Sequence, residues 1–259
     1  MKEIIMSDEL QYHIKLSKEQ GARYALIPGD PGRVEKIAGY LDSPRQIQYN
    51  REYNTFEGYL EGERVLVVST GIGGPSAAIC IEELSNIGVD TIIRIGTCGG
   101  MALDVDPGDV VIASGAIRLD GTSKEYMPIE FPAVADFGIT MELANAARSL
   151  GQKYHVGVVQ SKDSFYGQHS PESMPTSDEL SYKWRAWMRG GCLASEMESS
   201  TLFIVSAVRN LRSGALFHCV WNQEQAGCGM PVQRTHDTSA AIKIAVEAMR
   251  SIILKDKKL

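Results

Sequence analysis

The first candidate for chemistry is an arginine inside an apolar, β-branched run. Arg94 stands in the middle of 89–100, which reads VDTIIRIGTCGG and has the pattern of a buried parallel strand closed by glycine. A guanidinium does not lose its proton, so its burial requires an anionic partner. Gly96, Gly99 and Gly100 let a backbone approach a ligand closely. The stretch predicts a phosphate or carboxylate site. An arginine paired to a structural acid, or one that reaches water from an edge strand, is the alternative.

A second candidate anion site lies at the turn after the first predicted strand. Residues 28–33 read PGDPGR, in which Asp30 fits a helix N-cap and Pro31 fits the first helical position. Free N–H groups at the start of a helix, beside Gly29 and Arg33, can bind an anion. A tight turn with a solvated arginine is the alternative.

A glycine-rich turn at 71–76 (GIGGPS) resembles a dinucleotide fingerprint but does not satisfy it. The third glycine is replaced by Ser76. The next strand ends in Thr97, Cys98 and Gly99, where an acid for the ribose hydroxyl would be needed. We interpret these glycines as a close-packed turn between a strand and a helix.

A long polar stretch at 163–171 carries two aromatic residues and one amide. Long loops in compact domains are usually functional or disordered. The flat ring of Phe165 and the amide of Gln168 could hold a planar heterocycle. A surface loop with one packed aromatic residue is the alternative.

Two acids, Glu196 and Glu198, precede the apolar helix expected at 199–210. They are two residues apart and cannot share one helical face, and either could be a capping acid. His218 lies in the apolar stretch 214–221 and is expected to be a core histidine. Residues 223–232 form a glycine-bearing loop that could act as a flap.

Strands and helices alternate along the chain, which predicts an α/β fold with a mixed, mostly parallel central sheet flanked by helices. At 259 residues we expect a single domain, 1–259. Ligands in such folds gather at the carboxyl ends of strands, where Gly29, Thr70, Arg94, Gln168, Glu198 and Trp221 fall. We expect strands near 23–27, 65–70, 89–100, 108–113, 155–161 and 214–221, with a hairpin in 46–60. We expect helices at 34–41, 76–87, 137–150, 178–189 and 199–210. A last helix should begin at a Thr235 cap and end near 254.

Composition narrows the function classes. A net charge of −6 argues against a general nucleic-acid binder. The stretch 1–20 is polar, with no apolar targeting segment, and no apolar run is long enough to cross a membrane. The five cysteines are scattered without C-x-x-C spacing, which indicates reduced thiols in the cytoplasm and no zinc site.

Five segments carry a resemblance that covers nearly the whole chain. They are 27–37 (IPGDPGRVEKI), 69–76 (STGIGGPS), 94–97 (RIGT), 130–137 (EFPAVADF) and 196–199 (EMES). In these segments the sequence is similar to the hexameric class of nucleoside phosphorylases, and within it to members that act on uridine. That resemblance implies a three-layer α/β/α fold and phosphorolysis of uridine to uracil and ribose 1-phosphate.

The resemblance also implies roles for individual residues. Phosphate is the co-substrate and no cofactor is required. The protein is expected to be a cytoplasmic homo-oligomer, a hexamer built as a trimer of dimers, with shared active sites and a K⁺ or Na⁺ ion between subunits. The implied residues are Gly29, Arg33, Arg94, Thr97 and a neighbour's Arg51 for phosphate; Thr97, Met197, Glu198 and a neighbour's His13 for ribose; Phe165, Gln168, His169 and Glu196 for the base; and Glu52, Ile72 and Ser76 for the cation. Arg94, Glu198 and Gln168 would be the catalytic residues.

One position departs from the family pattern. Relatives place an arginine two residues after the glutamine, where it donates a hydrogen bond to the second carbonyl oxygen of uracil. In this sequence the residue two positions after Gln168 is Ser170. We expect His169, another loop residue or water to replace it.

Three other functions compete with this one. A purine nucleoside phosphorylase would need an acid after the strand at 214–221, where Asn222 and Gln223 precede the lone acid Glu224. A nucleosidase would use water and would not need three arginines. A binding protein without turnover is the third alternative.

Overall fold

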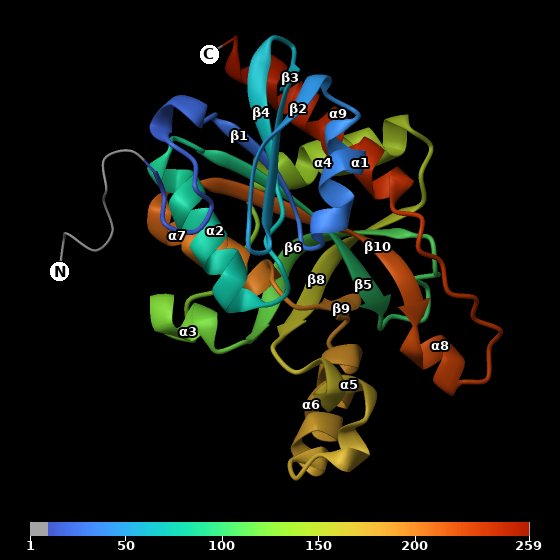
Figure 1. Cartoon of the computed structure of the whole chain (residues 1–259). Helices are drawn as coiled ribbons and strands as arrows, with labels where there is room; N and C mark the ends of the chain where they lie inside the picture. The colour runs from blue at the N-terminus through green and yellow to red at the C-terminus, as the bar shows by residue number, and fades with distance from the viewer. Residues whose placement is uncertain (1–9, 259) are drawn as a thin grey trace.

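The computed structural model contains one ten-stranded mixed sheet (Figure 1). It describes residues 10–258, so the first nine residues of the polar stretch 1–20 lie outside the described part. The strand order is β10-β6-β8-β9-β5-β1-β4-β3-β2, with β7 paired to β6. The strands are β1 (Tyr24–Pro28), β2 (Asp42–Asn50), β3 (Tyr53–Leu60), β4 (Glu63–Val68), β5 (Thr91–Gly100), β6 (Val110–Leu119), β7 (Ala133–Val134), β8 (Tyr154–Lys162), β9 (Ala194–Glu196) and β10 (Arg212–Asn222).

The sheet closes on itself at one end. Strand β10 pairs with β6 and also with β5, and β5 pairs with β9, which pairs with β8 and so returns to β6. Among the described strands, antiparallel pairings are as common as parallel ones. The sheet is therefore mixed, as predicted, but less parallel than predicted, because the β2–β4 meander and the ring closure add antiparallel pairs.

Helices cover both faces of the sheet, as the sequence predicted (Figure 1). The alternation of side chains along β1 explains how one strand serves two cores. Ala25 and Ile27 pack in a cluster with α2 and α7, whereas Tyr24 and Leu26 pack in a second cluster with α1, α4 and α9. The helices are α1 (Val34–Ala38), α2 (Gly74–Asn86), α3 (Thr122–Tyr126), α4 (Phe137–Ser149), α5 (Phe165–His169), α6 (Ser177–Arg189), α7 (Ser199–Arg209), α8 (Gln223–Gly227) and α9 (Ser239–Asp256), with 3₁₀ turns at Lys18–Gln20, Pro31–Arg33 and Pro171–Ser173.

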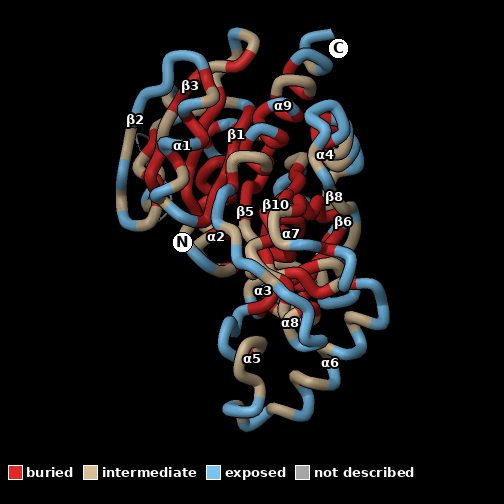
Figure 2. Tube along the Cα trace, turned by 90° about the vertical axis from the view of Figure 1, so that its right-hand side faces the viewer, coloured by how far each residue is buried: buried red, intermediate tan, exposed pale blue. Residues whose placement is uncertain are grey.

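Burial is greatest along the central strands of the sheet, whereas the edge strand β2 and a projecting segment have little or none (Figure 2). Every residue of β1 is buried, and so are the first six residues of β5. Helix α6 projects from the body with α5 and has no buried residue. No helix within residues 10–258 has the length and apolar character that a membrane span requires.

Three predictions for segments near the pocket were wrong, and a hydrogen bond explains each, while the helix predicted at 34–41 ends earlier, at Ala38. Residues 165–169 form α5 because the Ser164 hydroxyl accepts from Gly167 N at 3.0 Å, so the stretch 163–171 is not all loop. Residues 223–227 form α8 because the side chain of Asn222 caps it. Thr235 does not cap the last helix: its N–H donates to Val220 O at 3.1 Å, and α9 begins at Ser239.

Candidate active site

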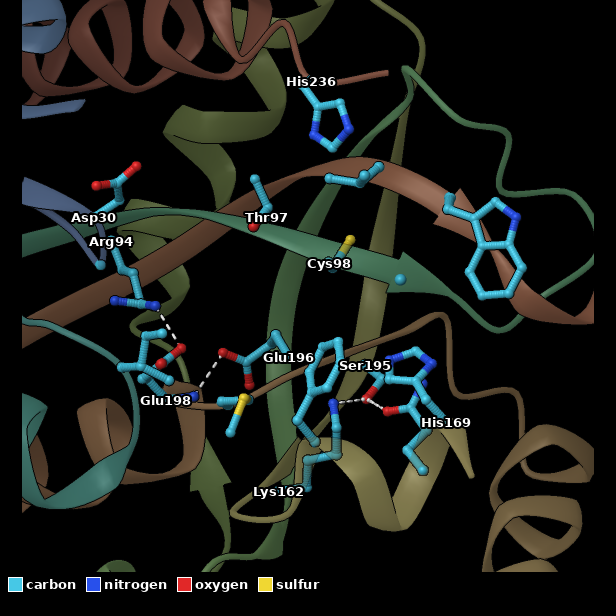
Figure 3. A pocket seen from close by; sticks show the side chains of 18 of the residues that line it. Asp30, Arg94, Thr97, Cys98, Lys162, His169, Ser195, Glu196, Glu198 and His236 are labelled. Carbon is cyan, nitrogen blue, oxygen red and sulfur yellow. Dashed lines mark hydrogen bonds and ion pairs between the residues drawn. The ribbon is translucent and has the colours of Figure 1, made fainter. Parts of the chain in front are cut away.

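The pocket of interest is a cavity of about 1060 Å³ where several strands end (Figure 3). Strand β1 leads into it at Gly29, β5 at Thr97, β8 at Lys162, β9 at Glu196 and β10 at Trp221. It is lined by Gly29, Asp30, Pro31, Arg33, Gly71, Ile72, Arg94, Thr97, Cys98, Gly99, Lys162, Phe165, Gln168, His169, Ser195, Glu196, Met197, Glu198, Val220, Trp221, Arg234 and His236.

Arg94 reaches one end of this pocket from the middle of β5. Its side chain is 5 % exposed, and Nη2 lies 2.5 Å from Glu198 Oε2. Nη1 donates to Thr70 Oγ1 at 3.2 Å, but Nε is buried with no partner among residues 10–258. The anionic partner that the sequence requires is therefore Glu198, and the arginine keeps a donor for a further acceptor.

Arg33 brings a second guanidinium to the same end. The predicted Asp30 cap is confirmed, since its carboxylate accepts from Gly32 N at 2.8 Å and starts the turn that carries Arg33. Arg33 Nε lies 3.6 Å from Asp30 Oδ2, while Nη1 is buried with no partner within 10–258. Burial and the charge of Arg94 lower the pKa of Arg33. Two facing cations with unpaired donors form an environment that favours an anion.

Gly29 explains how the backbone comes so close to these cations. A Cβ built on Gly29 would lie 3.2 Å from Gly71 O and 3.4 Å from Arg94 Nη2. A side chain there would push into the space between β1 and the two guanidiniums. The glycine is therefore needed for close approach, as the turn pattern suggested.

The two acids of the 196–199 turn have different environments. Glu196 accepts from Glu198 N at 2.9 Å and Ser199 N at 3.0 Å, and it also accepts from Ser161 Oγ, so it is the capping acid of α7. Burial, and next the charge of Glu198, raise the pKa of Glu196. Glu198 is instead held by Gly73 N at 2.7 Å and by Arg94, and it faces the pocket with Met197.

The other end of the pocket carries an amide and aromatic rings. Phe165 is 51 % exposed, and its ring centroid lies 4.3 Å from that of His169. Gln168 Oε1 accepts from Ser195 Oγ at 2.6 Å, and Gln168 Nε2 donates to Gln223 Oε1 at 3.3 Å. These contacts hold the amide beside an open ring face. Ser170 does not line the cavity.

Lys162 is a pocket residue that the sequence analysis missed. It is 4 % exposed at the end of β8, and its ammonium donates to Ser195 Oγ at 2.7 Å (Figure 3). Burial lowers its pKa to about 8. The one sequence signal was its place directly after the strand predicted at 155–161, at a strand end where ligands gather. Arg234 and His236, also missed, line the cavity from the segment before α9.

Four of the predicted site residues do not line this pocket. Arg51 is exposed at the turn between β2 and β3, with φ of +54°. His13 Nδ1 lies 2.7 Å from Glu83 Oε1. Glu52 accepts from Ser76 Oγ at 2.7 Å, whereas Ile72 does line the cavity and is 78 % exposed. The single chain thus assembles two of the three predicted arginines.

The amide of Asn222, at the end of β10, and the carboxylate of Glu224 make hydrogen bonds within the fold. Asn222 donates to Ala102 O and Val105 O and accepts from two backbone N–H groups of α8. Glu224 accepts from Trp184 Nε1 at 2.6 Å and does not line the cavity. His218 is buried, with Nε2 3.0 Å from Thr235 O, as expected for a core histidine.

The fold and the pocket define an α/β protein with a cavity at its strand ends that Arg33 and Arg94 line. Residues 23–255 match the family described as the Phosphorylase superfamily, and the chain belongs to that superfamily. It is 49 % identical over 253 residues to a uridine phosphorylase of Treponema pallidum, covering 98 % of each chain. It is 41 % identical to a uridine phosphorylase of Escherichia coli (96 % of this chain, 100 % of the relative) and 37 % identical to a guanosine phosphorylase of Halorubrum lacusprofundi (93 % and 99 %).

Proposed function

We propose that this protein catalyses the phosphorolysis of uridine, with uracil and ribose 1-phosphate as products. The full-length similarity to uridine phosphorylases supports the substrate. The observation that carries the chemistry is the pair Arg33 and Arg94, two guanidiniums with buried, unpartnered N–H groups at one end of a cavity. The whole chain, 1–259, acts as one domain of three-layer α/β/α architecture.

Phosphate is held at that end by Gly29, Arg33, Arg94 and Thr97. A phosphate oxygen forms a bond to C1′ of the ribose while the bond from C1′ to N1 of the base breaks and its electron pair leaves with the base. Positive charge develops on the sugar, and the phosphate below it stabilises that charge. The arginines neutralise the nucleophile and fix its position, which makes the attack effectively unimolecular.

The ribose lies between phosphate and base. Glu198 and Met197 hold its hydroxyls, because the Glu198 carboxylate is fixed by Gly73 N and Arg94 and faces the cavity. Thr97 lines the same wall. A neighbouring subunit's His13 reaches the 5′-hydroxyl.

The base lies against Phe165 and His169. Gln168 accepts from the ring N–H and donates to a carbonyl oxygen, and Ser195 fixes its orientation. Glu196 supports this wall from behind through the cap that it makes on α7. A site that forms hydrogen bonds to both the ring N–H and the carbonyl oxygen of uracil rejects a base that lacks these groups.

The working unit is a homo-oligomer, a hexamer built as a trimer of dimers, located in the cytoplasm and serving pyrimidine salvage. A neighbour's Arg51 completes the phosphate site. The exposure of Arg51 at the tip of the β2–β3 hairpin supports this arrangement. Arg51 and His13 are outside the pocket of their own chain, which is consistent with their serving another.

A monovalent cation, K⁺ or Na⁺, would lie between subunits on Glu52, Ile72 and Ser76. The residues fit such an ion, because the hydrogen bond from Ser76 lowers the pKa of Glu52 and keeps it a carboxylate, and hard cations prefer oxygen ligands. Its contribution would be to hold two subunits together. No other cofactor is required.

A purine substrate is the second candidate, favoured by the similarity to a guanosine phosphorylase. It would need an acid near the purine ring, but Asn222 and Glu224 are both engaged elsewhere. The test is to incubate the protein with uridine, thymidine, inosine or guanosine, with and without phosphate, and to follow the released base. Phosphate-dependent release of uracil supports the proposal. Preferential release of a purine, release without phosphate, or binding without release would each replace it.

A further inference from the structure

A buried cation lies at the base end of the cavity, with no carboxylate of residues 10–258 within ion-pair distance. Lys162 is 4 % exposed and makes no ion pair with any carboxylate in residues 10–258. Its ammonium has three N–H donors, and Ser195 Oγ is the one acceptor that the described residues provide. Burying an unpaired charge is costly, so such a group is expected where a ligand completes its environment.

The surroundings of Lys162 place it beside the base and away from the phosphate. Ser195, which holds the ammonium, also hydrogen-bonds Gln168 at 2.6 Å. The charge of Lys162 lowers the pKa of His169, second to burial. In Figure 3, Lys162, Ser195 and His169 lie together on one side of the cavity, and Arg94 and Glu198 lie on the other.

We propose that Lys162 donates a charged hydrogen bond to a carbonyl oxygen of the bound pyrimidine and stabilises the negative charge that the base acquires as it leaves. This inference rests on the proposed phosphorolysis of uridine. It also supplies the donor that Ser170 cannot provide, since Ser170 does not line the cavity.

The bond-breaking step needs no proton transfer, and the pyrimidine anion takes its proton from water afterwards to give uracil. The electron pair of the broken bond moves into the pyrimidine ring and onto its carbonyl oxygens, while Lys162 keeps its proton. A preorganised cation aimed at developing charge lowers the barrier more than one that must reorganise. Ser195 is the positioning residue, because it fixes the ammonium and the Gln168 amide at the same time.

Other charges around Lys162 set its titration. Glu196, Glu198 and the Cys98 thiol raise its pKa, but burial outweighs them and brings it to about 8. The ammonium is therefore charged below pH 8 and loses its proton as the pH rises through that value. The wild-type kcat/KM, which reports the free enzyme, should fall on the alkaline side with an apparent pKa near 8.

The experiment compares Lys162→Met with wild type on uridine and on 5-fluorouridine, whose leaving base carries negative charge more easily. The kcat/KM for uridine should fall by about 100-fold, the size found when one preorganised donor is removed. The loss on 5-fluorouridine should be at least fivefold smaller. The alkaline decrease of kcat/KM near pH 8 should disappear. The melting temperature should be unchanged or higher, because a buried charge without an ion-pair partner in residues 10–258 is gone.

Lys243→Met, an exposed lysine of α9, is the matched control and should behave as wild type. If Lys162→Met does not fold, Lys162→Gln and the wild-type pH profile give the same comparison. Equal losses on both nucleosides, or a pH profile that Lys162→Met leaves unchanged, would overturn the inference. Wild type that releases no uracil with phosphate would overturn the proposed function itself, and that result is seen before any variant is made.

Discussion

Replacing Arg33 with methionine should separate function from stability. In the folded chain Arg33 has one ion-pair partner in residues 10–258, Asp30, at 3.6 Å, and the Asp30 side chain is 58 % exposed. Such a pair contributes about 0–1 kcal/mol. Arg33 also faces the like charge of Arg94, which lowers its pKa after burial. We therefore expect Arg33→Met to change the free energy of unfolding by less than about 1 kcal/mol, or a melting shift of about 2–4 °C.

The same change should strongly weaken phosphate binding. Hydrogen bonds from a charged donor contribute about 1.5–3 kcal/mol, which corresponds to roughly 10- to 150-fold in affinity. The KM for phosphate should rise within that range, while the KM for uridine changes by less than about threefold, because Arg33 lies at the phosphate end. Initial rates at saturating uridine and varied phosphate give the KM for phosphate. Initial rates at saturating phosphate and varied uridine give the KM for uridine.

Arg94→Met is the matched comparison. It should lose phosphate affinity too, but it leaves Glu198 as a buried carboxylate without its cation, which costs about 3–5 kcal/mol. The opposite result would be that Arg33→Met unfolds as readily as Arg94→Met while its KM for phosphate stays at the wild-type value. Arg33 would then be a structural residue.

Three further outcomes follow from the structure. Gln168→Ala should lower kcat/KM for uridine by about 100-fold without changing the KM for phosphate, and a loss of only a few-fold in the same rate assay would remove Gln168 from base recognition. Arg51→Ala and Glu198→Gln should each be nearly inactive, yet a refolded mixture should regain activity because one mixed site is intact. No recovery in the mixture would contradict shared sites. Arg212 hydrogen-bonds Asp256 and lowers its pKa below the ordinary 3.8, so this pair stabilises the fold above pH 3.8 and the stability is lost as the pH falls below it. Asp256→Asn should lower the free energy of unfolding by about 1–3 kcal/mol at pH 7, measured by urea unfolding. It should also reduce the loss of stability at low pH. An unchanged loss at low pH would mean that other groups cause it.

The sequence predicted those features that local physics determines. A guanidinium in a buried strand needs an acid, and Arg94 has Glu198. Asp30 before Pro31 marks a cap, and the cap forms. The alternation of strands and helices also predicted the α/β class.

The features that were missed depend on contacts distant in the sequence. The ring closure depends on a three-residue strand, β9, and on β10 pairing on both edges, which no local pattern reveals. The helix at 165–169 is too short for periodicity to detect, although Ser164 could have indicated its start. Lys162 was missed because its burial follows from the closed ring. The position of Arg51 outside the pocket of its own chain also follows from no local pattern.

In the proposed reaction, inorganic phosphate held by Arg33 and Arg94 is the nucleophile that displaces the base. Phosphorus-31 NMR of the protein with uridine and limiting phosphate follows this nucleophile. We predict one ribose 1-phosphate formed and one phosphate consumed for each uracil released, with no release when phosphate is omitted. Uracil released at the same rate without phosphate, together with free ribose, would show that water displaces the base instead.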